Sequence, residues 1–175
     1  LGRQLKGKVL GIVGMGRIGS LVSKYALALD MEIIYFDPFV VNKEFKKCTS
    51  LNQLLSLSDI VSFHVHLDKS TINLINSENI KYIKTGSFLI NTSRGEIFDE
   101  KSIYPHVKSG QISGIASDVL EGELSESLNN SFFRKLQDEG ENVILTPHIG
   151  GATVEAMQSC EEYISSFFLS NSVSL

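Results

Sequence analysis

The sequence predicts an α/β protein built on a doubly wound parallel sheet. Apolar runs alternate along the chain with segments of helical periodicity, and the strongest runs are continuously apolar. Continuous apolar runs are typical of strands buried on both faces, as in a parallel sheet that helices cover. Parallel strands also need crossover connections, which the intervening helical segments supply. We therefore expect one domain over residues 1–175, in three layers, α/β/α.

The first half of the chain contains the most regular elements. Strands are expected at residues 8–13, 32–36 and 60–64, and a short helix at 51–57 with Ser50 as its N-cap. Between the first two strands, apolar residues recur at three- and four-residue spacing, which predicts an amphipathic helix. Its apolar stripe should pack on the sheet and consists of Ile18, Leu21, Val22, Tyr25, Ala26 and Leu29.

The second half continues the alternation of helices and strands. Asp99 is a suitable N-cap and Gly110 a suitable terminator for a helix between them. Residues 121–130 are polar and are expected to form a loop. The remaining expected elements are helices at 78–83, 131–136 and 153–169 and strands at 87–91, 113–118 and 142–145. Six strands that alternate with helices indicate right-handed crossovers.

Composition excludes several classes of protein. The chain has 175 residues, 42% of them hydrophobic and 21% charged, which is ordinary for a globular domain. A net charge of −4 gives no reason to expect nucleic acid or an anionic membrane as a partner. No apolar run is long enough to span a bilayer, and the first eight residues lack the apolar core of a signal peptide. Cys48 and Cys160 lie far apart, so we expect reduced thiols, a cytoplasmic protein and no metal site.

A glycine motif joins the first expected strand to its helix. The run 9–13 leads into Gly14-Met15-Gly16-Arg17-Ile18-Gly19, and the run 33–36 ends on Asp37. The first glycine permits a tight turn, the second lets a pyrophosphate approach the backbone, and the third lets the helix pack on the sheet. The acid can accept hydrogen bonds from a ribose diol and repels a 2′-phosphate. The motif favours a Rossmann fold that prefers NAD to NADP; the alternative is an ordinary strand–helix turn.

Polar side chains follow the other apolar runs where each expected strand ends. They are His64, residues 91–94, Asp118 and His148. Parallel strands end at the same edge of a sheet, and ligands on doubly wound sheets bind beyond that edge. We therefore expect these groups to line one site.

Four stretches in this order resemble the D-isomer-specific 2-hydroxyacid dehydrogenase family, specifically its NAD-binding domain. They are GIVGMGRIG at 11–19, INTSRGEIFDE at 90–100, ASDVLEGE at 116–123 and TPHIGGATVEAM at 146–157, and the resemblance begins near Leu5. It implies an enzyme that transfers a hydride between NAD and C2 of a small 2-hydroxy or 2-keto acid. The stretch HIGGAT at 148–153 and the Glu-Ala pair that follows it resemble the phosphoglycerate branch of the family.

By this resemblance, three residues form the catalytic set: Arg94, Glu123 and His148. The histidine can exchange a proton near neutral pH, and a carboxylate beside it favours its protonated form. The arginine can hold a substrate carboxylate or polarise a carbonyl. The acid remains open between Glu123, which matches the family spacing, and Glu121, because Leu124 stands where the family usually has proline.

The cofactor set also carries over from the family. The pyrophosphate turn is matched by Gly14, Gly16, Arg17, Ile18 and Gly19. Asp37 matches the adenosine-ribose acid, Thr92 and Arg94 match backbone contacts near the nicotinamide ribose, and Gly150 lies beside the nicotinamide. Asp118 matches the acid that accepts from the carboxamide; the alternative is a strand-end cap.

One position departs from the family pattern. His66 replaces a proline that usually flanks the adenine pocket, and we expect NAD binding to survive the change. His64 and His66 alternate along a strand and would face the same side, but no third metal ligand is evident.

In the family, the cofactor domain is inserted into a discontinuous substrate domain, whose sequence is absent from this chain. The 175 residues are therefore expected to bind NAD with little or no turnover, because the other wall of the cleft is missing. The family also implies a homodimer through this domain. The alternative function is a non-catalytic NAD-sensing or dimerisation module, as in relatives that act as transcriptional co-repressors.

Overall fold

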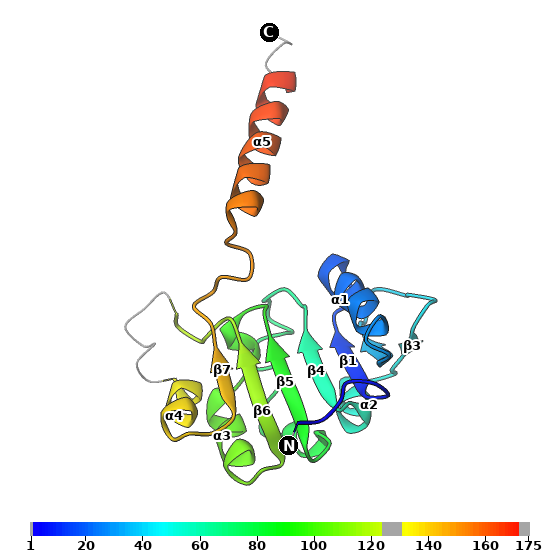
Figure 1. Cartoon of the computed structure of the whole chain (residues 1–175), viewed down its shortest axis with the longest axis vertical. Helices are drawn as coiled ribbons and strands as arrows, with labels where there is room; N and C mark the ends of the chain where they lie inside the picture. The colour runs from blue at the N-terminus through cyan, green and yellow to red at the C-terminus, as the bar shows by residue number, and fades with distance from the viewer. Residues whose placement is uncertain (1, 124–130, 172–175) are drawn as a thin grey trace.

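Seven parallel strands form one sheet in the computed structural model, which describes residues 2–123 and 131–171 (Figure 1). The spatial order is β3-β2-β1-β4-β5-β6-β7, and every ladder is parallel. The strands are β1 (Val9–Val13), β2 (Glu32–Phe36), β3 (Lys46–Lys47), β4 (Ile60–Phe63), β5 (Ser87–Asn91), β6 (Ile112–Ser117) and β7 (Val143–Leu145). The doubly wound parallel sheet expected from the sequence is confirmed.

Helices connect the strands in the expected places. They are α1 (Arg17–Leu27), α2 (Leu51–Leu57), α3 (Glu100–Lys108), α4 (Phe132–Asp138) and α5 (Val154–Asn171), with 3-10 turns η1 (Ile80–Tyr82) and η2 (Gly95–Ile97). The side chains of Ser50, Asp99 and Ser131 cap α2, α3 and α4 by accepting backbone N–H groups.

Two details of the expected elements are wrong. The helix expected at 78–83 is only the turn η1. The Asn76 side chain accepts the N–H groups of Glu78 and Asn79, so these residues form a turn before η1, and Ile83 is already extended. The two-residue edge strand β3 was not expected. The expected loop 121–130 is described only up to Glu123, so its remainder lies outside the described residues.

The sheet has a core on each face. The larger core lies under α2, α3 and α4 and includes Phe63, Phe98 and Phe133, whose rings pack edge to face. The smaller core lies under α1, against β1 and β2. Over β4 to β7 that second face carries a hollow of about 500 Å³, where Ile144 is 62% exposed. The helical layer on the α1 side therefore covers only part of the sheet.

Only part of the expected stripe on α1 contacts the sheet. Ala26 is buried and Val22 packs against the smaller core. The other buried residues are Gly19 and Ser23, whereas Ile18, Leu21, Tyr25 and Leu29 are exposed. The cause is the closeness of α1 to the glycine turn: a Cβ atom on Gly19 would lie 2.1 Å from the Gly14 carbonyl oxygen. Small side chains face the sheet for this reason, and the larger apolar ones point outward.

Helix α5 extends away from the carboxyl edge of the sheet (Figure 1). Most of its side chains are exposed, including Tyr163, Phe167 and Phe168. Across residues 2–123 and 131–171, no helix combines the length and the apolar character needed to cross a membrane.

Candidate active site

The strand register brings the expected site residues into one row. Val13 is paired with both Phe36 and Phe63, and the pairing continues through Asn91, Ser117 and Leu145. The residues that follow these positions therefore leave the sheet side by side at its carboxyl edge. They are Gly14, Asp37, His64, Thr92, Asp118 and Thr146.

The glycine turn forms one wall of a cavity at this edge. Gly14 has a φ of 93°, and a Cβ atom there would lie 2.6 Å from the His64 carbonyl oxygen, so only glycine fits without displacement. The space beside Gly16 is open, and α1 begins without a side-chain cap. Its first N–H groups can therefore meet a phosphate.

The cavity has a volume of about 650 Å³ and is lined by residues 16–18, 64–67 and 92–94. It joins the glycine turn to the segments after β4 and β5, which is the arrangement that an extended dinucleotide needs. Thr92 and Arg94 are both exposed there. Asp37, Asp118 and Gly150 lie at the same edge but outside the lining of this cavity. The residues present fit NAD.

Asp37 makes contacts that sequence reasoning did not anticipate. Its carboxylate is 8% exposed and accepts the N–H groups of Met15 at 2.9 Å, Phe39 at 2.8 Å and Val40 at 2.9 Å. The side chain thus ties the glycine turn to the end of β2. A carboxylate can accept about four hydrogen bonds, so one position is left for a ribose hydroxyl.

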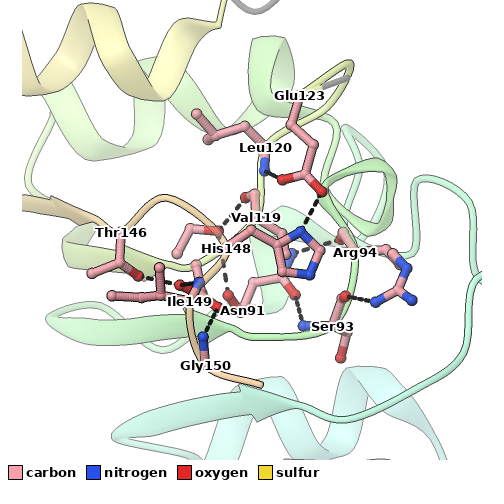
Figure 2. Close-up of polar contacts among 12 residues, drawn as sticks. Asn91, Ser93, Arg94, Val119, Leu120, Glu123, Thr146, His148, Ile149 and Gly150 are labelled. Carbon is pink, nitrogen blue, oxygen red and sulfur yellow. Dashed lines mark hydrogen bonds and ion pairs between the residues drawn. The ribbon is translucent and has the colours of Figure 1, made fainter. Parts of the chain in front are cut away.

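The turn after β5 presents Arg94. The Asn91 side chain closes this turn: its amide group donates to the Arg94 carbonyl at 2.8 Å, and its amide oxygen accepts the Ser93 N–H at 3.0 Å (Figure 2). The Ser93 hydroxyl donates to the Phe63 carbonyl at 2.7 Å, which holds the turn against β4. Within residues 2–123 and 131–171, the exposed guanidinium bonds only to the Ser93 carbonyl, at 2.6 Å, which leaves its other donors available there. Sequence reasoning missed Asn91 and Ser93 as positioning residues.

His148 contacts Glu123. The Nδ1 atom of the histidine lies 2.6 Å from Oε1 of the glutamate, and Figure 2 shows the carboxylate pointing at the ring. The other oxygen, Oε2, accepts the Leu120 N–H at 3.3 Å. An ionised carboxylate is only an acceptor, so Nδ1 carries the proton and Nε2 faces away from the pair. Of the two acids left open by the sequence, the structure brings Glu123 to the histidine.

Asp118 builds the turn that carries His148. Its Oδ1 accepts the Thr146 hydroxyl and the Ile149 N–H, and its Oδ2 accepts the Gly150 N–H at 2.8 Å. The His148 N–H bonds to the Asp118 carbonyl at 2.9 Å, which holds His148 at a φ of 53°. Burial opposes ionisation of Asp118, but these donors outweigh it and lower its pKa below the ordinary 3.8. These contacts are those of a cap at the end of a strand, which was the alternative role for Asp118. Its contact with the nicotinamide carboxamide stays a prediction.

Two histidines line the cavity wall. Burial lowers the pKa of His64 to about 4, so its ring is neutral at pH 7, and its Nε2 lies 2.9 Å from the Ser62 hydroxyl. His66 lies two residues on, in the same lining. Among the residues that the structure describes, no three His, Cys, Asp or Glu side chains gather to hold a metal ion.

The site thus combines three chemical capacities at one edge. The cavity offers backbone donors to a diphosphate, the Arg94 guanidinium offers a fork to a carboxylate, and the His148–Glu123 pair offers proton transfer at Nε2. Proton transfer beside a bound dinucleotide is what reduction of a carbonyl group requires, because the carbon receives a hydride and the oxygen a proton.

Comparison with known proteins identifies the relatives of this chain. The family model described as "D-isomer specific 2-hydroxyacid dehydrogenase, NAD binding domain" matches residues 1–150. A glyoxylate reductase of Thermofilum pendens is 41% identical over an alignment of 169 residues, which covers 92% of this chain and 47% of that protein. A D-3-phosphoglycerate dehydrogenase of Haemophilus influenzae is 42% identical over 160 residues, 89% of this chain and 38% of that protein.

Solved structures agree. D-lactate dehydrogenase of Aquifex aeolicus, complexed with NAD and lactic acid, superposes with a TM-score of 0.81 at 34% identity, over 99% of this chain and 56% of that one. A D-isomer specific 2-hydroxyacid dehydrogenase of Lactobacillus delbrueckii ssp. bulgaricus, in its NAD-complexed form, gives 0.89 at 27% identity, over 99% and 56%. The chain spans about half the length of the relatives it matches.

The hydrogen bonds of Asp118 predict a pH-dependent stability. Asp118→Asn should lower the free energy of unfolding by about 1–3 kcal/mol at pH 7, because the Thr146 hydroxyl and the Ile149 and Gly150 N–H groups lose a charged acceptor. The folded-state pKa lies below 3.8, so this contribution is complete above pH 3.8 and is lost as the pH falls through the folded value. Urea unfolding of both proteins between pH 7 and pH 3 measures the difference.

The control is Glu155→Gln on the exposed helix α5, for which we expect a change within about 0.5 kcal/mol. A difference between wild type and Asp118→Asn that persists undiminished at pH 3 would contradict the role given to the ionised carboxylate.

Proposed function

The chain belongs to the D-isomer specific 2-hydroxyacid dehydrogenase family, and we propose that it acts in hydride transfer between NAD(H) and C2 of a small 2-hydroxy or 2-keto acid. It is an NAD-binding domain of that family. The observation that carries the proposed reaction is the 2.6 Å contact between His148 and Glu123, at the same sheet edge as the dinucleotide cavity.

In the proposed mechanism, each side chain has one task. Bound NADH supplies the hydride. Protonated His148 donates its Nε2 proton to the substrate oxygen in reduction and accepts it back in oxidation. Glu123 fixes the Nδ1–H tautomer and stabilises the imidazolium. Arg94, whose guanidinium has free donors, binds the substrate carboxylate.

The proposal assigns the substrate choice and the closing of the cleft to residues outside this chain. The matched regions are 47% and 38% of the two relatives, so each relative has more sequence outside the match than within it. We further propose that the protein forms a homodimer through this domain and acts in the cytoplasm. A phosphoglycerate-like acid is the leading candidate for its substrate. The exposed apolar side chains of α1, such as Leu21 and Tyr25, support association with another surface.

Cofactor choice tests the role of Asp37. The chain should bind NADH at least about tenfold more tightly than NADPH, because a carboxylate repels a 2′-phosphate. Asp37→Asn should reduce that ratio, and it should also weaken NADH binding, because the Met15 and Phe39 N–H groups lose a charged acceptor. Titration by NADH fluorescence or calorimetry measures both affinities.

The matched control is Asp59→Asn. Asp59 also accepts a backbone N–H, from Val9 at 2.9 Å, but it precedes β4 at the opposite end of the strand. Equal affinities of the wild type for NADH and NADPH would remove Asp37 from cofactor selection.

A turnover assay tests whether the active-site cleft needs a second wall, from outside this chain. The 175-residue chain should bind NADH yet reduce no member of a 2-keto acid panel at a useful rate, because the His148 side chain is 48% exposed to water. A rate of NADH oxidation well above the protein-free rate, with any keto acid, would contradict this. A longer form that binds NAD and also fails with every acid would favour the sensing or dimerisation module.

A substitution tests the acid–base role. In a longer form that turns over a keto acid, His148→Ala should lower kcat about 10²–10⁴-fold with NADH affinity nearly unchanged. His106→Ala is the control, since His106 lies in α3 and bonds Gln111 at 2.6 Å, away from the site. Unchanged kcat in His148→Ala would remove the histidine from the mechanism.

A further inference from the structure

One histidine of the cofactor cavity has no task in the proposed reaction. His64 directly follows β4, and its half-buried side chain lines the cavity together with residues 16–18 and 92–94. Burial lowers the pKa of the ring to about 4, so at pH 7 the ring is neutral and carries one proton, on Nδ1 or on Nε2. The nitrogen that holds this proton decides what the ring offers to a ligand.

Ser62 determines the position of that proton. Its hydroxyl oxygen lies 2.9 Å from Nε2 of His64, and the serine is 4% exposed. Within residues 2–123 and 131–171, this ring nitrogen is the only hydrogen-bond partner of the hydroxyl. A buried hydroxyl that does not donate loses the hydrogen bond that water would accept from it. The hydroxyl therefore donates to Nε2, and the proton of the neutral ring is on Nδ1.

The Nδ1–H group is available to a ligand. Among the described residues it has no hydrogen-bond partner, and the side-chain atoms that are buried there without a partner are Ser87 Oγ and Glu100 Oε1. Nδ1 is therefore not sealed inside the protein, and the side chain that bears it lines the cavity. The same lining includes Arg17 and Arg94 and no acidic residue, which favours an anion as the ligand.

The neighbours of His64 point to a diphosphate as that anion. A Cβ atom on Gly14 would lie 2.6 Å from the His64 carbonyl oxygen, so His64 packs directly against the glycine turn. On the other side, the Ser93 hydroxyl donates to the carbonyl of Phe63, the residue before His64, at 2.7 Å. His64 thus lies between the turn whose N–H groups can meet a phosphate and the turn that carries Arg94.

We propose that His64 donates a hydrogen bond from Nδ1 to the diphosphate of the bound dinucleotide and that Ser62 holds its ring in the required tautomer. Ser62 lies in β4 and His64 directly follows that strand, so the donor is oriented before the cofactor binds. The inference concerns cofactor binding and does not depend on the proposed hydride transfer, because an enzyme and a non-catalytic NAD sensor would both use this contact.

The first test is a nitrogen-15 and proton NMR spectrum of the histidine rings in the 175-residue chain, which has four histidines. His64 is assigned by its loss in His64→Ala. Without ligand, its ring should be the Nδ1–H tautomer. Saturating NADH should shift Nδ1 and its proton, and so should ADP, which also contains a diphosphate. Adenosine, which has no phosphate, should leave both signals in place.

The ring of His106 is the internal control for these spectra. It is also half-buried, and its Nδ1 lies 2.6 Å from the Gln111 side chain, at the end of α3. None of the three ligands should shift it. An Nε2–H tautomer of His64 in the ligand-free chain would overturn the role of Ser62. A His64 ring that NADH does not shift would overturn the contact, and so would a shift that ADP fails to reproduce or that adenosine reproduces in full.

The second test measures affinity by titration of NADH fluorescence. His64→Ala should weaken NADH binding about 10–100-fold, because a hydrogen bond to a charged group is lost. Ser62→Ala should weaken it by a smaller factor and should give a ring spectrum with both tautomers, because Nε2 has lost its donor. His106→Ala, the matched control, should keep the wild-type affinity.

Wild-type NADH affinity in folded His64→Ala would overturn the proposal, and a pure Nδ1–H tautomer in Ser62→Ala would overturn the part given to the serine. Should His64→Ala not fold, the spectra of the wild type with NADH, ADP and adenosine decide by themselves. His64 is then assigned by elimination, from the signals lost in His66→Ala, His106→Ala and His148→Ala. Thermal unfolding establishes that each variant is folded at the temperature of the measurement.

Discussion

The parallel register of the sheet is the constraint on which the site depends. Val13, Phe63, Asn91 and Ser117 are paired across four neighbouring strands, so the segments that follow them emerge in one row. Register in a buried sheet is strongly specified, because a one-residue slip would turn every buried side chain to the opposite face. Apolar packing of the sheet therefore aligns the polar residues at its carboxyl edge, although these residues are spread along the chain from Gly14 to His148.

Two carboxylates fix the conformation of the loops that follow the strands. Asp37 accepts three backbone N–H groups around the glycine turn, and Asp118 accepts two from the residues that follow His148. A φ of 53° at a non-glycine residue costs of order 1–3 kcal/mol, which these bonds must offset. The two acids that the sequence predicts to contact the cofactor thus already hold the loops in shape. Binding then loses little entropy to loop ordering.

Sequence reasoning succeeded where the signal was local. The strands at 32–36 and 87–91 and the helix at 51–57 with its Ser50 cap have the expected bounds, because apolar runs and caps are read from neighbours in the chain. It was only partly right on α1, where close approach to the sheet leaves most of the expected apolar stripe exposed. It could not choose between Glu121 and Glu123 or find the Ser93 contact to Phe63, since these depend on segments that meet only after folding.

The exposure of the proton-transfer pair explains how the work is divided in the proposed enzyme. The side chains of His148 and Glu123 are 48% and 23% exposed, so water competes for both and weakens their electrostatic effect. The orientation of these groups is already provided by the sheet register, by the Asp118 turn and by the close approach of Gly95 to the Leu120–Glu121 peptide. This chain does not exclude water from the pair, and both a hydride donor and a protonated imidazole need water to be excluded. The positions of the groups therefore belong to this chain, whereas the low dielectric that makes them effective has to come from a surface that closes over them.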